Sequence, residues 1–154
     1  MTVEVGRVVP DFFAASTGGE FHLSDARGSA LLIYFYPKDH TSGCTAESKD
    51  FAAAYSRFVD HQARILGVSR DSIESHASFK EKLNLPFELL SDPEERLCTL
   101  FGVIKNKTMY GRPVRGIERS TFLLDAKGVL RREWRGVKVP GHVDEALAAV
   151  RSLG

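Results

Sequence analysis

The sequence has little of several features that define large classes of protein. It contains only two cysteines, too few for the disulfide framework of a small secreted protein, so each thiol needs its own explanation. Its longest apolar run, residues 30–36, has about a third of the length that a membrane-spanning helix needs. No basic segment followed by an apolar stretch opens the chain, so we expect no export signal, no membrane association and a cytoplasmic location.

Charge of one sign is not in excess either. Lysine and arginine total 21 and acidic residues 20, a net charge of +1, which excludes a broad cationic surface and predicts no nucleic-acid partner. The five histidines show no metal-ligand spacing with one another or with the cysteines, so we predict no metal and no other cofactor. With 154 residues, 43% of them apolar, the sequence predicts one compact domain over residues 1–154.

The hydrophobic periodicity predicts alternating strands and helices. Residues 30–36 (ALLIYFY) form a short apolar run with β-branched and aromatic members that ends at Pro37, which is typical of a strand buried on both faces. The remaining predicted elements are a helix at 44–61, a strand at 65–69, a helix at 73–83, an extended segment at 87–90, a helix capped by Asp92 with Pro93 in its first position and running to about residue 101, strands at 120–124 and 129–134, and a helix at 143–153. Residues 105–115 are expected to form a solvated loop.

The order of these elements resembles that of a thioredoxin-like α/β sandwich. Parallel βαβ connections are followed by an antiparallel hairpin, and an N-terminal β-hairpin is expected around Gly18 and Gly19. The predicted fold class is therefore α/β, with a central mixed β-sheet flanked by helices.

Cys44 follows the buried strand and opens the next predicted helix. Unpaired N–H groups and the helix dipole stabilise a thiolate at this position, and the thiolate is the nucleophilic form of cysteine. Gly43 has no β-carbon and would let a substrate approach the backbone amides beside the sulfur. Thr41 can donate a hydrogen bond to the sulfur, cap the helix, or do both. We expect a nucleophilic cysteine here.

Attack of a thiolate on a peroxide also needs fixed donors for the charge that develops on the leaving oxygen. Arg119, directly before the strand at 120–124, is the candidate because a guanidinium offers several N–H groups in a rigid fork. A surface ion pair is the other interpretation of this arginine. Glu47 either orients Arg119 or only favours the helix N-terminus. Pro37 is expected to shield the sulfur from bulk water.

The pattern Pro37-x-x-x-Thr41-x-x-Cys44 resembles the peroxidatic motif of the peroxiredoxins. Residues 35–47 (FYPKDHTSGCTAE), 66–71 (LGVSRD) and 116–122 (GIERSTF) are similar to the peroxiredoxin Q, or bacterioferritin comigratory protein, subfamily, and the likeness covers nearly the whole chain. The resemblance places Pro37, Thr41, Cys44 and Arg119 on the family's four active-site positions.

The same resemblance implies a function in antioxidant defence. It implies a thiol peroxidase that reduces hydrogen peroxide and organic hydroperoxides through a sulfenic acid at Cys44. Thioredoxin, glutaredoxin or a small thiol would be the reductant, and the protein would be a monomer.

The resolving thiol is where the sequence departs from this family. Lys49 and Lys80 stand at the two positions where relatives usually carry a resolving cysteine. Two interpretations of Cys98 stay open: it packs in the core, where free cysteines are common, or it resolves Cys44 after local unfolding. If Cys98 does not resolve Cys44, an external thiol must attack the sulfenic acid directly.

Three other functions fit the sequence less well. A thioredoxin-like disulfide oxidoreductase needs Cys-x-x-Cys, and Glu47 stands where its second cysteine would be. A redox-sensing or holdase module would consume peroxide stoichiometrically, without turnover. A cysteine hydrolase would have to use His142, which nothing in the sequence places near Cys44.

Overall fold

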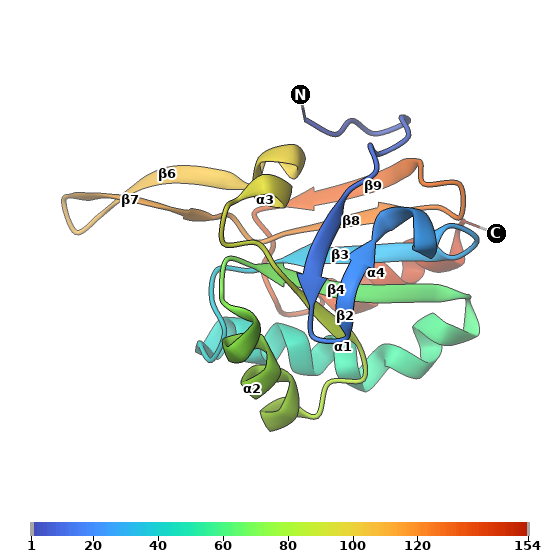
Figure 1. Ribbon diagram of the computed structural model, residues 1–154, viewed down its shortest axis with the longest axis horizontal. Helices are drawn as coiled ribbons and strands as arrows, with labels where there is room; N and C mark the ends of the chain where they lie inside the picture. The colour runs from blue at the N-terminus through green and yellow to red at the C-terminus, as the bar shows by residue number, and fades with distance from the viewer. Residues whose placement is uncertain (1, 154) are drawn as a thin grey trace.

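In the computed structural model, which describes residues 2–153, seven strands form one mixed β-sheet (Figure 1). The strand order is β2-β1-β5-β4-β3-β8-β9. These strands are β1 (Phe13–Ser16), β2 (Gly19–His22), β3 (Ala30–Phe35), β4 (Ala63–Ser69), β5 (Glu88–Ser91), β8 (Ser120–Leu124) and β9 (Leu130–Arg135). The helices are α1 (Ser42–Asp60), α2 (Ile73–Leu83), α3 (Arg96–Phe101) and α4 (His142–Arg151), with a 3-10 turn at Leu23–Ala26. Within residues 2–153, no helix has the length and apolarity needed to cross a membrane.

Strand β3 separates two hydrophobic cores. It pairs in parallel with β4 and antiparallel with β8, so its side chains alternate between two covered faces. Leu31, Ile33 and Phe35 enter one core, together with α3 and the N-terminal segment. Leu32 and Tyr34 enter the other, which is built from α1, α2 and α4. The helix that carries Cys44 and the helix that carries Cys98 therefore pack against opposite faces of the sheet.

The structure confirms the predicted α/β class, with a mixed sheet flanked by helices. Strands β3, β4 and β5 are parallel neighbours, as expected for βαβ connections. Strands β8 and β9 form the expected antiparallel hairpin. The N-terminal hairpin is also present, with Ser16 paired to Gly19 across the β1–β2 turn.

Two predicted elements are wrong. The third helix begins at Arg96 and not at Pro93, because Glu95 has a left-handed backbone (φ 61°) and residues 92–95 form a turn. Residues 105–115 are not a loop. They belong to a second, two-stranded sheet in which β6 (Ile104–Met109) pairs with β7 (Arg112–Ile117). This hairpin projects away from the main sheet (Figure 1).

Candidate active site

Cys44 lies in the first turn of α1, the helix that follows β3 in the chain. Thr41 is the N-cap residue, with an extended backbone (φ −95°, ψ 155°), so the amides of the first helical turn point toward the start of the helix. The Cys44 side chain is buried in the core beneath α1, with only 1% of the residue exposed. A thiolate at this position is stabilised by the positive end of the helix dipole.

Arg119 brings a fixed positive charge to the sulfur from the other side of the site. It lies between β7 and β8, and its Nη2 atom donates to Cys44 Sγ at 3.4 Å. Gly43 makes this approach possible, because a β-carbon at this position would lie only 3.1 Å from Nη2. Burial alone would lower the pKa of Arg119, but the charges of Glu47 and Cys44 outweigh it and raise this pKa above its ordinary value.

Glu47 holds the guanidinium in place. Its Oε1 atom accepts from Arg119 Nη1 at 2.7 Å, so one arginine bridges the carboxylate and the sulfur. Glu47 is three residues after Cys44 and therefore on the same face of α1. Its side chain is fully buried, and its Oε2 atom is without a hydrogen-bond partner within the described residues. Burial raises the pKa of Glu47 to about 7, against the opposing effect of Arg119. Of the two roles expected for Glu47, the geometry favours orienting Arg119.

A family model described as the AhpC/TSA family matches residues 5–133. The chain belongs to this family. It is 49% identical to "Peroxiredoxin Bcp" of Bacillus subtilis, over 99% of this chain and 98% of that protein. It is 48% identical to a solved structure of Xanthomonas campestris peroxiredoxin Q, with a TM-score of 0.90 and 97% and 96% of the two chains covered.

A further Xanthomonas campestris structure concerns the alkyl peroxide reduction activity of the bacterioferritin comigratory protein. It is 47% identical, with a TM-score of 0.91 and with 98% of this chain and 97% of that chain covered. Together these relatives place the chain in the peroxiredoxin Q subfamily and show a thioredoxin-like fold. This peroxiredoxin is a thiol-dependent peroxidase, with a peroxide as substrate and a thiol as reductant.

Thr41 and Pro37 of this peroxiredoxin lie in the loop between β3 and α1. The Thr41 hydroxyl donates to the Lys38 carbonyl oxygen at 2.7 Å, and its oxygen accepts from no amide of α1. It therefore makes neither the expected hydrogen bond to the sulfur nor the expected helix cap. Pro37 is exposed at the start of the loop. The structure thus joins Cys44, Arg119 and Glu47 by direct contacts, with Gly43 beside the guanidinium and Thr41 and Pro37 preceding them in the loop.

Cys98 is not part of this site. It is fully buried in α3, in the core on the other face of the sheet, and its backbone N–H donates to Asp92 Oδ2 at 2.8 Å. Burial, together with the neighbouring Asp92 carboxylate, raises the pKa of the Cys98 thiol well above its ordinary range. In this environment the thiol is not an activated nucleophile.

Proposed function

We propose that Cys44 is the peroxidatic cysteine and that Arg119 activates it. The observation that supports this role most strongly is the 3.4 Å contact between the guanidinium and a sulfur at a helix N-terminus. The Cys44 thiolate attacks one oxygen of the hydroperoxide, an S–O bond forms, and the O–O bond breaks. The sulfur is oxidised to a sulfenic acid, and the second oxygen leaves as hydroxide or alkoxide and takes up a proton. Arg119 stabilises the charge on this leaving oxygen.

Thr41 is proposed to bind the peroxide, although it does not touch the sulfur. Its hydroxyl proton is already donated to the Lys38 carbonyl, so the lone pairs of its oxygen are left to accept the O–H of an incoming hydroperoxide. Pro37 keeps its proposed role of shielding the Cys44 sulfur from bulk water. We propose hydrogen peroxide and alkyl hydroperoxides as substrates, supported by the Xanthomonas relative described for alkyl peroxide reduction.

The sulfenic acid is proposed to be reduced by an outside thiol. Lys80 stands at one of the usual resolving positions, and its Nζ atom binds Glu88 Oε1 at 2.7 Å. Cys98 lies across the sheet from Cys44. One external thiol attacks the sulfenic sulfur and releases water, and a second thiol then frees Cys44 as the pair is oxidised to a disulfide. Thioredoxin, glutaredoxin or a small thiol would serve as this reductant.

The remaining expectations also stay proposals. Coverage of the Bacillus relative over nearly its full length supports one functional domain over residues 1–154. The monomeric state and the cytoplasmic location stay predictions from the sequence.

Steady-state turnover tests the proposed function. Hydrogen peroxide and cumene hydroperoxide would each be supplied to the wild type, Cys44→Ser and Cys98→Ser with excess dithiothreitol or a thioredoxin system. We expect many turnovers by the wild type and by Cys98→Ser, and none by Cys44→Ser. Full activity of Cys44→Ser, or a single turnover by the wild type, would contradict the proposal.

A further inference from the structure

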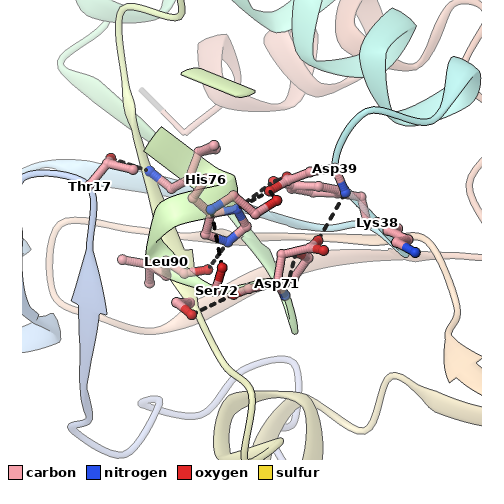
Figure 2. A network of polar contacts seen from close by, with 12 residues as sticks. Thr17, Lys38, Asp39, Asp71, Ser72, His76 and Leu90 are labelled. Atoms are coloured by element: carbon pink, nitrogen blue, oxygen red, sulfur yellow. Dashed lines mark hydrogen bonds and ion pairs between the residues drawn. The ribbon is translucent and has the colours of Figure 1, made fainter. Parts of the chain in front are cut away.

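A buried polar network joins the loop before Cys44 to helix α2 (Figure 2). At its centre is Asp39, which is 3% exposed. Asp39 Oδ1 accepts from the Tyr36 hydroxyl at 2.6 Å. Asp39 Oδ2 accepts from the Ser75 hydroxyl at 2.8 Å and lies 2.7 Å from His76 Nδ1. The loop is thus bound through one carboxylate to the first turn of α2.

Hydrogen bonds hold the His76 ring on two sides. The ring is completely buried, with Nδ1 2.7 Å from Asp39 Oδ2 and Nε2 2.8 Å from the Leu90 carbonyl oxygen. Nδ1 also lies 3.5 Å from the Tyr36 hydroxyl. A carboxylate oxygen accepts, so Nδ1 donates to Asp39. His76 therefore joins the Asp39 carboxylate to β5.

Two further contacts hold the same loop. The Asp39 N–H donates to Asp71 Oδ2 at 2.9 Å. His40 has a left-handed backbone (φ 64°), and its ring meets Phe79 of α2 edge-on at 5.2 Å between centroids. A non-glycine residue keeps such a backbone only where its surroundings hold it there. The shape of the loop is therefore imposed by α2 and by the segment before it.

We propose that His76 is a positioning residue for the peroxidase reaction: it holds Asp39, and thereby fixes residues 37–41 beside Cys44. Thr41 is two residues from Asp39, so a shift of Asp39 moves the peroxide-binding hydroxyl. This inference rests on the proposed role of Cys44. It adds a residue that touches neither the sulfur nor the substrate.

His76→Gln tests this role through two reactions of Cys44. Peroxide reduction needs the loop in place, whereas alkylation by iodoacetamide needs only an accessible thiolate. We expect the second-order rate constant for hydrogen peroxide to fall by about 10- to 100-fold, as for a small misplacement of reacting groups. The alkylation rate and its pH profile should stay close to those of the wild type. Equal losses in both reactions would overturn the inference.

Lys80→Met is the matched control on the same helix. It breaks the ion pair with Glu88, which lies away from the loop, and should lower thermal stability while preserving the peroxide rate constant. An equal loss of peroxide rate in Lys80→Met would overturn the positioning role. Ser75→Ala removes one hydrogen bond to Asp39 and should reduce the peroxide rate less than His76→Gln does. If His76→Gln does not fold, Ser75→Ala is used to test the positioning role instead.

Nitrogen-15 NMR of the His76 ring gives an independent readout. A proton on Nδ1 that is hydrogen-bonded to the Asp39 carboxylate is expected in the wild type, and an Nδ1 without a proton would overturn the inference. A wild type that did not react with peroxide would instead contradict the proposed function. A wild type that reacted normally, with a folded His76→Gln that reacted equally fast, would contradict only the positioning role.

Discussion

Among single residues, Glu47 is in the least ordinary environment of the site. A carboxyl group fully removed from water, with one oxygen lacking a described partner, is unfavourable in its charged form. The ion pair with Arg119 offsets part of this penalty, but burial dominates and raises the pKa of Glu47 to about 7. The residue that orients the Arg119 guanidinium is therefore expected to change its charge near neutral pH.

Glu47 is expected to make the stability of the protein depend on pH. In the unfolded chain this carboxyl ionises near its ordinary pKa of 4.5, so between pH 4.5 and about 7 the folded state binds more protons than the unfolded state. The stabilisation is complete below pH 4.5 and is lost as the pH rises through about 7. Relative to Glu47→Gln, the wild-type free energy of unfolding should fall by roughly 1–3 kcal/mol across this window.

Urea denaturation at several pH values measures this difference. Glu94→Gln, which removes an exposed carboxylate, should leave the wild-type profile unchanged. Parallel profiles for the wild type and Glu47→Gln would contradict the raised pKa.

Sequence reasoning found the residues of the site more readily than their contacts. Cys44 and Arg119 were predicted from a local motif and from the chemistry of peroxide attack, and they do lie together. The Asp39–His76 pair was not predicted, because its members are 37 residues apart and His76 belongs to no recognisable motif. Only the tertiary fold brings them together. The hydroxyl of Thr41 was expected to donate to the sulfur, to cap the helix or to do both, but the loop geometry directs it to Lys38.

At the scale of elements, the buried β3 and α1 were predictable and the exposed β6–β7 hairpin was not. Strand β3 and helix α1 have the apolar periodicity of a core, and both lie close to their predicted bounds. The β6–β7 hairpin has no such periodicity, because its exposed positions carry Lys105, Lys107 and Arg112 and it packs against little else. Its two strands are held together by their hydrogen bonds to each other. The spacing of apolar residues reports burial in a core and therefore does not predict such a pair of strands.

Helix α3 shows how a cap can act from outside the helix. Asp92 was predicted to cap a helix that begins at Pro93, but its carboxylate instead reaches the amides of Leu97 at 3.1 Å and Cys98 at 2.8 Å. Asp92 is 5% exposed, so these amides have no water to replace it. The capping chemistry was predicted correctly, and the start of the helix was misplaced by the turn at residues 92–95.

Asp92→Ala should therefore destabilise the protein through α3. Loss of two buried hydrogen bonds at a helix start is expected to lower the free energy of unfolding by about 1–2 kcal/mol. Urea denaturation measures this loss, and reaction of Cys98 with a thiol reagent reports whether α3 opens more often. Asp92→Asn keeps an acceptor oxygen and should lose less. Unchanged stability in Asp92→Ala would show that the turn, and not the carboxylate, defines the start of α3.

At the scale of the whole molecule, the sheet separates the two thiols. A disulfide needs α-carbons within about 7 Å of each other. Cys44 packs beneath α1 on one face, and Cys98 packs beneath α3 on the other, among Phe35, Phe101 and Phe122. For the two sulfurs to meet, α3 would have to leave a core in which its cysteine is completely buried. The architecture thus favours reduction of Cys44 by a thiol from outside the chain.

Intact mass after one equivalent of hydrogen peroxide decides between the two cycles. We expect the wild type and Cys98→Ser to behave alike, each gaining one oxygen, and each forming a mixed disulfide at Cys44 when a small thiol is added. Cys98 should stay a free thiol that reacts with alkylating reagents only after denaturation. A loss of two hydrogens in the wild type that is absent from Cys98→Ser would contradict this. It would mean that α3 unfolds in every turnover, and Asp92→Ala, which weakens α3, would then speed disulfide formation.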